Sequence, residues 1–244
     1  LFLLDLRDYQ TIILEGKDVG KIYEKIISEM KSFIGLDIIE QTKDSIVIKN
    51  FSTEDKELSP RPLIKKIDLG LRSMFDLLST FFHSGFSKDD YFELQKMKEQ
   101  NDRIYSLTRK IILKAIERPH LIRSFKTTYH QLTKDKVVVG IMNNLSSLLE
   151  SVGSSFLYLE HRKKDVGFLK EIFEPIEKEY RLILNTMKYK NYPDIFHSIS
   201  KYNQSISEME KNRKMFEQPL MLEAMTYILV IKDLLNHLAF EIIE

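Results

Sequence analysis

The sequence predicts a mainly α-helical protein, with two tandem three-helix bundles behind a small α/β domain. Three observations lead to this prediction. Short segments rich in β-branched residues occur near the start of the 244-residue chain. From Leu63 onward, apolar residues recur at helical spacing almost without interruption. One apolar stripe of this helical region also recurs 102 positions later.

The recurring stripe indicates a duplicated helical unit. Its members are Leu94, Met97, Asn101, Ile104 and Leu107 in the first copy, and Phe196, Ile199, Asn203, Ile206 and Met209 in the second. The acidic residues do not recur, because Lys201 and Gln204 stand where the first copy has Glu99 and Asp102. We therefore expect the second copy to keep the core of the first and to have lost its carboxylates.

The first domain is expected over residues 1–58 as a β-α-β-β unit. Its predicted elements are a strand at 9–14, a helix at 19–34, and a hairpin of 36–40 with 45–51 around Lys43 and Asp44. Gly35 is a suitable C-cap for the helix. Residues 52–62 are polar and contain two prolines, so they are expected to form a linker.

The helical sets are expected at residues 59–163 and 164–244. Their helices are predicted at 63–85, 87–119, 134–162 and 168–188, then from Pro193 and from Pro219, with a loosely patterned stretch up to Thr133. Ser87 with Asp90 three positions later matches a capping box. Proline suits a first helical turn. Because the connecting segments are short, neighbouring helices are expected to be antiparallel.

The last predicted helix is apolar on nearly every side. A helix of this kind is buried in a bundle or covered by another subunit, and the sequence leaves both alternatives open. His237 lies within this helix and is expected to be a core histidine that a polar neighbour satisfies.

Composition excludes several classes of protein. The net charge of +1 gives no basic footprint for nucleic acid. The absence of cysteine removes disulfides, thiolate zinc sites and cysteine nucleophiles. No segment reaches the roughly 18 consecutive apolar residues that a membrane-spanning helix needs. No phosphate-binding loop, nucleophile elbow or His-Glu-x-x-His is present, so the sequence offers no catalytic constellation.

Three carboxylates are candidate metal ligands. Glu99 and Asp102 lie three positions apart on one predicted helix, so they project from the same face. Glu150, on the next long helix, could approach them across the bundle. Helical bundles build metal sites from carboxylates on neighbouring helices, because hard cations require several oxygen ligands. The alternative is a solvated helix face, since the 36 acidic residues produce such pairs by chance.

Several segments resemble the archaeal branch of PhoU-like phosphate uptake regulators. They are Ile-Gly-Leu-Asp-Ile-Ile-Glu at 34–40, Ser-Ile-Val-Ile-Lys-Asn-Phe at 45–51, the long helix from Leu63, and Asn-Asp-Arg-Ile-Tyr-Ser-Leu at 101–107. The resemblance covers essentially the whole chain. In that branch an AbrB-like DNA-binding hairpin commonly precedes the connecting domain, so we expect an AbrB-like part upstream of Leu1, where an initiator methionine is also missing.

The resemblance implies a cytoplasmic, non-enzymatic regulator of phosphate transport and phosphate homeostasis. It implies a homodimer that contacts phosphate transporter components or a sensor protein. Transcription regulation through DNA would involve the upstream domain alone, and no membrane insertion is expected.

The resemblance also implies a surface cluster of iron or zinc, held by an acidic motif that Glu99 and Asp102 match. On the third helix of each repeat, Glu150 is carried over in the first and His237 in the second, where Lys232 and Asn236 replace carboxylates. Because a fixed ammonium repels cations, we expect no metal on the second repeat beyond a vestigial site at His237. At most, a weak divalent, iron or zinc site is expected on the first.

Two rival functions remain open. The first is a metal-dependent helical-bundle phosphatase built around Glu99, Asp102 and Glu150. The second is an oligomerisation module whose ligand sites have decayed. The loss of carboxylates from the second repeat favours the second rival over an intact metal sensor.

Overall fold

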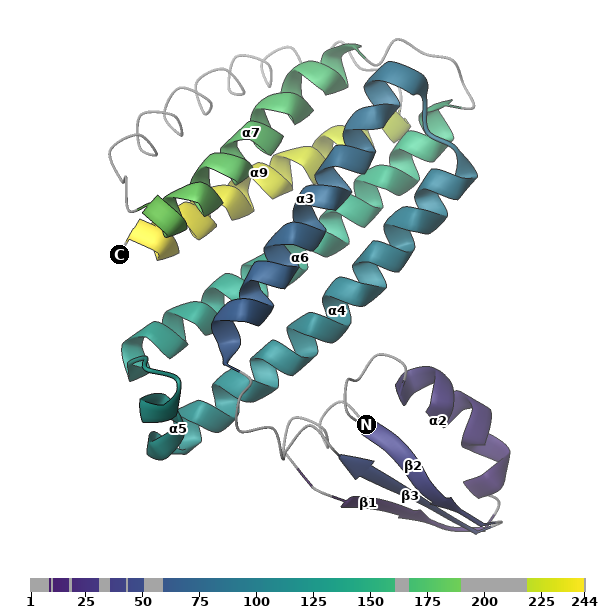
Figure 1. The fold of residues 1–244 in the computed structure, drawn as a ribbon. Coiled ribbons are helices and arrows are strands. Elements are labelled where there is room, and N and C mark those ends of the chain that lie inside the picture. The colour runs from purple at the N-terminus through teal and green to yellow at the C-terminus, as the bar shows by residue number, and fades with distance from the viewer. Residues whose placement is uncertain are drawn as a thin grey trace. The chain divides into compact units, whose positions relative to one another are not determined.

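The computed structural model describes residues 9, 11–17, 19–30, 36–42, 44–50, 59–160, 167–189 and 219–243 (Figure 1). It is mainly helical, with a small antiparallel sheet near the start, as the sequence predicts. The chain divides into two compact units, one of residues 1–66 with 102–139 and the other of residues 67–101 with 140–244. Residue 58 and residues 163 and 164 lie outside the described ranges, so the predicted domain boundaries at 58/59 and 163/164 stay predictions.

The predicted β-α-β-β unit is confirmed. Its elements are β1 (Thr11–Glu15), a short 3-10 helix η1 (Val19–Ile22), α2 (Tyr23–Met30), β2 (Leu36–Gln41) and β3 (Ser45–Asn50). The strands are antiparallel in the order β1-β3-β2. The first turn of the predicted helix is 3-10 rather than α, which is common at helix N-termini. Residues 31–35, which include the expected Gly35 cap, lie outside the described residues.

One face of this sheet forms a small core with α2. Ile12 of β1 pairs with Ile48 of β3, and both side chains are buried. Because side chains alternate along a strand, Ile13 points to the other face, where it is 57% exposed. The core of the unit consists of Ile12, Ile26, Met30, Ile46 and Ile48.

The described helices follow the predicted order closely. They are α3 (Pro60–Ser84), α4 (Lys88–Glu117), α5 (Pro119–Ser124), α6 (Tyr129–Glu160), α7 (Gly167–Tyr189) and α9 (Pro219–Ile243). The predicted capping box is present, because the Ser87 N–H donates to Asp90 Oδ2 (2.8 Å) and the Asp90 N–H donates to Ser87 Oγ (3.1 Å). Gly85, with a φ of 87°, ends α3 in the left-handed conformation that glycine adopts without strain.

Two predicted boundaries were wrong. Pro60 and Pro62 belong to the first turn of α3 rather than to a linker, because a missing N–H costs nothing at a helix start. The loosely patterned stretch before Thr133 contains α5 and the first turn of α6. Helix α6 begins at Tyr129 because Thr128 caps it, accepting a hydrogen bond from the Gln131 N–H (3.1 Å).

An aromatic cluster joins α3, α6 and α7 in the unit that contains residues 67–101 and 140–244. The Phe81 and Phe156 rings stack with centroids 4.2 Å apart, and Phe173 of α7 lies 6.1 Å from Phe156. Polar contacts reinforce the packing of α7 on α3, since the Tyr180 hydroxyl donates to Asp68 Oδ1 (2.9 Å). Helix α7, the first of the predicted second set, therefore shares a core with helices of the first set.

The predicted repeat cannot be followed through this region. The second copy of the apolar stripe and the helix expected from Pro193 lie outside the described residues. The duplication therefore stays a prediction.

Helix α9 buries one face rather than all of its surface. Its buried side chains include Ala224, Met225, Ile228, Ile231, Leu235 and Leu238. Val230 and Phe240, on other sides of the helix, are 42% and 57% exposed. Of the helices that the structure describes, none combines the length and apolar character that crossing a membrane requires.

Candidate functional site

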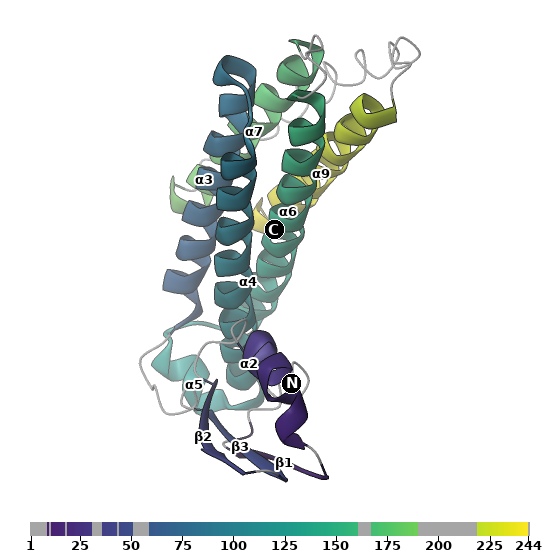
Figure 2. The ribbon, with the colours of Figure 1, turned by 90° about the vertical axis from the view of Figure 1, so that its right-hand side faces the viewer.

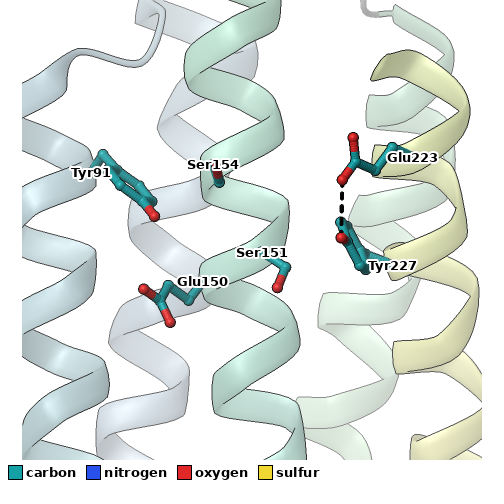
Figure 3. A pocket seen from close by; sticks show the side chains of 6 residues that line it. All are labelled: Tyr91, Glu150, Ser151, Ser154, Glu223 and Tyr227. Carbon is teal, nitrogen blue, oxygen red and sulfur yellow. Dashed lines mark hydrogen bonds between the residues drawn. The ribbon is translucent and has the colours of Figure 1, made fainter. Parts of the chain in front are cut away.

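A polar hollow of about 220 Å³ lies where α4, α6 and α9 approach one another. It contains one of the predicted metal ligands, Glu150. The hollow is lined by Tyr91 of α4, Glu150, Ser151 and Ser154 of α6, and Glu223 and Tyr227 of α9 (Figure 3). The lining therefore presents two carboxylates and four hydroxyl groups.

Helical periodicity places these side chains. Glu150, Ser151 and Ser154 lie on one face of α6, because residues three and four apart are neighbours on a helix surface. The opposite face of α6 carries Val152 and Phe156, which are fully buried. The α6 sequence thus builds a core with one face and the wall of the hollow with the other.

Hydrogen bonds orient both carboxylates of the hollow. The Tyr227 hydroxyl donates to Glu223 Oε1 (3.0 Å), one turn earlier on α9. This hydrogen bond, together with the charge of Glu223, raises the pKa of the Tyr227 phenol, so the phenol stays protonated. Gln95 Nε2 of α4 donates to Glu150 Oε1 (3.4 Å). The Ser151 hydroxyl donates to the Ser147 carbonyl of its own helix (3.1 Å).

This set of groups suits a small ligand that is cationic or rich in hydroxyl groups. Carboxylates attract a cation, and phenol and serine hydroxyls can donate to or accept from a polar ligand. The sequence reasoning singled out Glu150 but missed Tyr91, Glu223 and Tyr227. A signal for the last two existed in the spacing of a carboxylate and a phenol four positions apart on α9.

The structure does not assemble the predicted carboxylates as a three-ligand group. Glu99 is exposed on α4, and Gln95, one turn earlier, donates a hydrogen bond to Glu150. Asp102 is half-buried. Within the described ranges, no three or more His, Cys, Asp or Glu side chains gather closely enough to hold a metal ion.

The expectation for His237 was wrong. Its side chain is exposed on α9 rather than set in the core. Helix α9 buries a single face, and His237 lies off that face, so it needs no buried polar partner. Lys201, the other cation expected in the second repeat, lies outside the described residues.

Helix α7 carries a buried carboxyl group that does not belong to the hollow. Glu179 has no exposed surface, and neither of its oxygens accepts a hydrogen bond from the residues that the structure describes. Burial raises the pKa of Glu179 to about 7, although the positive charge of Lys232 on α9 acts to lower it. The amide oxygen of Asn236, one turn after Lys232, is also buried and accepts no hydrogen bond from the described residues. The carboxyl of Glu179 is therefore neutral in mildly acidic solution and charged in alkaline solution.

Comparisons of the chain with protein-family models, with curated proteins and with solved structures found no match. The resemblance to PhoU-like regulators therefore depends on the segments quoted above.

Proposed function

We propose that the chain is a non-enzymatic regulator of phosphate uptake that acts by binding protein partners, as PhoU-like regulators do. The observation that carries the proposal is the order of elements, a small antiparallel sheet with one helix followed by long capped helices. The segments that resemble PhoU-like regulators lie largely on strands and helices of this fold. Residues 36–40 belong to β2, residues 45–50 to β3, and residues 101–107 to α4.

The long helices supply the surface for partners in this proposal. The exposed Val230 and Phe240 on α9 give that helix apolar side chains outside the core, which suit a contact with another protein. The proposed partners are a second copy of the chain and either a component of a phosphate transporter or a phosphate sensor. The proposed location is the cytoplasm.

The first prediction concerns partner binding. We expect the immobilised chain to retain the transporter's ATPase or the sensor in a phosphate-dependent way. In a separate measurement, we expect the free chain to elute as a dimer in light-scattering chromatography. Asp102→Ala should leave retention unchanged, because no chemistry at that carboxylate is required. Metal-dependent hydrolysis of a phosphate ester that Asp102→Ala abolishes would instead establish the phosphatase alternative. A dimer that retains neither partner at any phosphate concentration would establish the oligomerisation module.

The second prediction concerns metal at the first repeat. We expect calorimetric titration with Zn²⁺ or Fe²⁺ to show weak binding that Glu150→Gln reduces, because an amide lacks the charge that attracts a cation. His237→Ala should leave that binding unchanged and serves as the matched control. A tightly held, stoichiometric metal that survives Glu150→Gln and disappears in His237→Ala would refute the assignment.

A further inference from the structure

Positive charge is concentrated in the helical part of one compact unit. Residues 60–66 and 102–139 contain twelve Lys and Arg against three Asp and Glu, an excess of nine positive charges. The whole chain carries a net charge of +1, so the rest of the chain is correspondingly acidic. The small net charge therefore conceals a strong asymmetry between two parts of the protein.

The fold gathers basic runs that are short and separate in the sequence. Helix α5 connects the end of α4 to the start of α6, and α3 begins at the same end of the helices (Figures 1 and 2). The starts of α3 and α6 lie near enough for their charges to interact, because the positive charge of Arg61 on α3 acts to lower the pKa of the Asp135 carboxyl on α6. We call this surface the basic end. Its exposed members are Arg61, Lys65, Lys66, Arg123, Lys126 and Lys136.

Within residues 60–66 and 102–139, exposed acidic side chains offset little of this charge. Asp135 is 4% exposed and accepts a hydrogen bond from Gln131 Nε2 (2.8 Å), so it lies below the surface. Burial raises the pKa of the Asp135 carboxyl, although the positive charges of Arg61 and Lys134 act to lower it. Glu117 is the exposed acidic side chain of this region. The basic end therefore presents a positive potential to solvent.

The backbone at Lys126 adds a second, independent observation. Lys126 has a φ of 50°, in the left-handed region where glycine is favoured. It occupies the position after the C-cap of α5, with its N–H donating to the Arg123 carbonyl (3.1 Å) and the Thr127 N–H donating to the Ile122 carbonyl (3.2 Å). Glycine would fit this turn with less strain. A lysine at this position keeps a positive charge on the basic end at a cost in backbone strain that glycine would avoid.

The surrounding side chains indicate the class of partner. Tyr129, His130, Thr133 and Lys136 form an exposed stripe along the start of α6. The Thr133 hydroxyl donates to the Tyr129 carbonyl (3.0 Å), and the other three side chains can donate hydrogen bonds to a ligand. Within the described part of residues 102–139, Tyr129 and Val137 are the large apolar side chains that are exposed. A membrane-binding surface would present several Leu, Phe or Trp side chains for insertion. Phosphate contacts in protein–DNA complexes come from Arg, Lys, Ser, Thr and Tyr side chains.

We propose that the basic end binds the phosphate backbone of duplex nucleic acid, independently of any upstream domain and of the function proposed above. The contacts are ionic and do not read the base sequence.

The third prediction tests this surface on the whole chain. In fluorescence anisotropy with a labelled, random-sequence DNA duplex, we expect binding that weakens steeply as salt rises. Combining Arg123→Gln with Lys136→Gln should weaken it by about tenfold or more at ~0.1 M salt and lower the salt slope by about two. Lys126→Gly should weaken binding while raising the melting temperature, because glycine relaxes the turn.

The matched control removes two exposed lysines from the other unit, Lys88→Gln with Lys178→Gln, and should leave binding unchanged. Equal weakening by the control would overturn the proposal, since it would show a general charge effect. Binding to phosphatidylglycerol vesicles without binding to the duplex would assign the surface to membranes instead. A duplex affinity that the basic-end variants leave intact would overturn the proposal as well.

Discussion

Replacing Glu179 with glutamine is expected to stabilise the protein in alkaline solution and to remove a large part of the pH dependence of its unfolding. The carboxyl of Glu179 is fully buried, and neither oxygen has a hydrogen bond from the described residues. An ionised carboxylate in such a place is costly, and the nearby Lys232 offsets part of that cost. A neutral amide of nearly the same shape avoids the charge.

The direction of the effect follows from the two pKa values. Burial raises the pKa of Glu179 from 4.5 to about 7, so between these values the folded protein binds more protons than the unfolded chain. The free energy of unfolding therefore falls as pH rises from about 4.5 to about 7, and the stability that the protonated group contributes is lost above that range. Across this pH range, the contribution of Glu179 to the free energy of unfolding falls by roughly 3 kcal/mol.

Denaturant unfolding at pH 5 and pH 8 measures this prediction. We expect Glu179→Gln to be more stable than the unmodified protein at pH 8 and to differ little from it at pH 5. Lys232→Met should lower stability at pH 8, because it removes the positive charge that partly compensates the buried carboxylate. Glu171→Gln, an exposed substitution on the same helix, is the control and should leave the pH profile unchanged.

Other charged groups on neighbouring helices have partners of their own. On α3, Asp76 accepts a hydrogen bond from Arg181 Nη2 (2.6 Å), and Asp68 binds Arg72 and the Tyr180 hydroxyl. These contacts place the α3 charges beside residues that flank Glu179 in the α7 sequence. A pH profile that Glu179→Gln leaves intact would show that another group controls the stability.

The sequence predicted those features that local chemistry determines. Ser87 and Asp90 form a capping box because the two residues satisfy each other within one turn, whatever surrounds them. The strands of the first unit were predicted because short segments there are rich in β-branched residues. The start of α6 was missed because Thr128 caps it in a stretch without a strong apolar pattern.

Features that depend on distant residues were harder to predict. Glu179 lies between Ile176 and Ile183 on the buried stripe of α7, so helical spacing alone could have marked it as buried. Predicting that no described residue donates a hydrogen bond to it, and that Lys232 lies nearby, would have required knowing how α7 packs against α9. The hollow likewise combines Glu150 with Glu223, which no local pattern relates.

The close approach of α4 and α6 depends on Gly153, and Gly153→Ala is expected to destabilise the protein. A methyl group at this position would overlap the Leu94 Cδ2 atom of α4 and would lie 3.3 Å from Leu78 Cδ2 and 3.6 Å from Phe86 Cζ. All of these neighbours are buried, so Leu94 has little room to move aside. Overpacking of this kind costs about 1–3 kcal/mol, which exceeds the gain of up to about 1 kcal/mol from alanine's helix propensity.

Gly140→Ala on the same helix is the matched control, and we expect it to raise the stability of the protein rather than lower it. Beyond the adjoining residues and the nearby backbone of α6 itself, no heavy atom of the described residues lies within 4 Å of the position that a Cβ at Gly140 would take. Alanine should then stabilise α6 by up to about 1 kcal/mol through helix propensity. Melting temperatures of the two variants measure the contrast. Equal shifts in both would show that α4 and α6 are not held together at Gly153.

The same pair of variants connects packing with the hollow. Tyr91 and Gln95 of α4 reach the hollow and Glu150 because α4 lies close to α6 at Gly153, next to Ser154. If the added methyl group pushes the two helices apart, the Gln95–Glu150 hydrogen bond lengthens and weak metal binding at Glu150 changes in Gly153→Ala. Gly140→Ala should leave that binding as it is. Unaltered metal binding in a destabilised Gly153→Ala would show that the shape of the hollow does not depend on this helix contact.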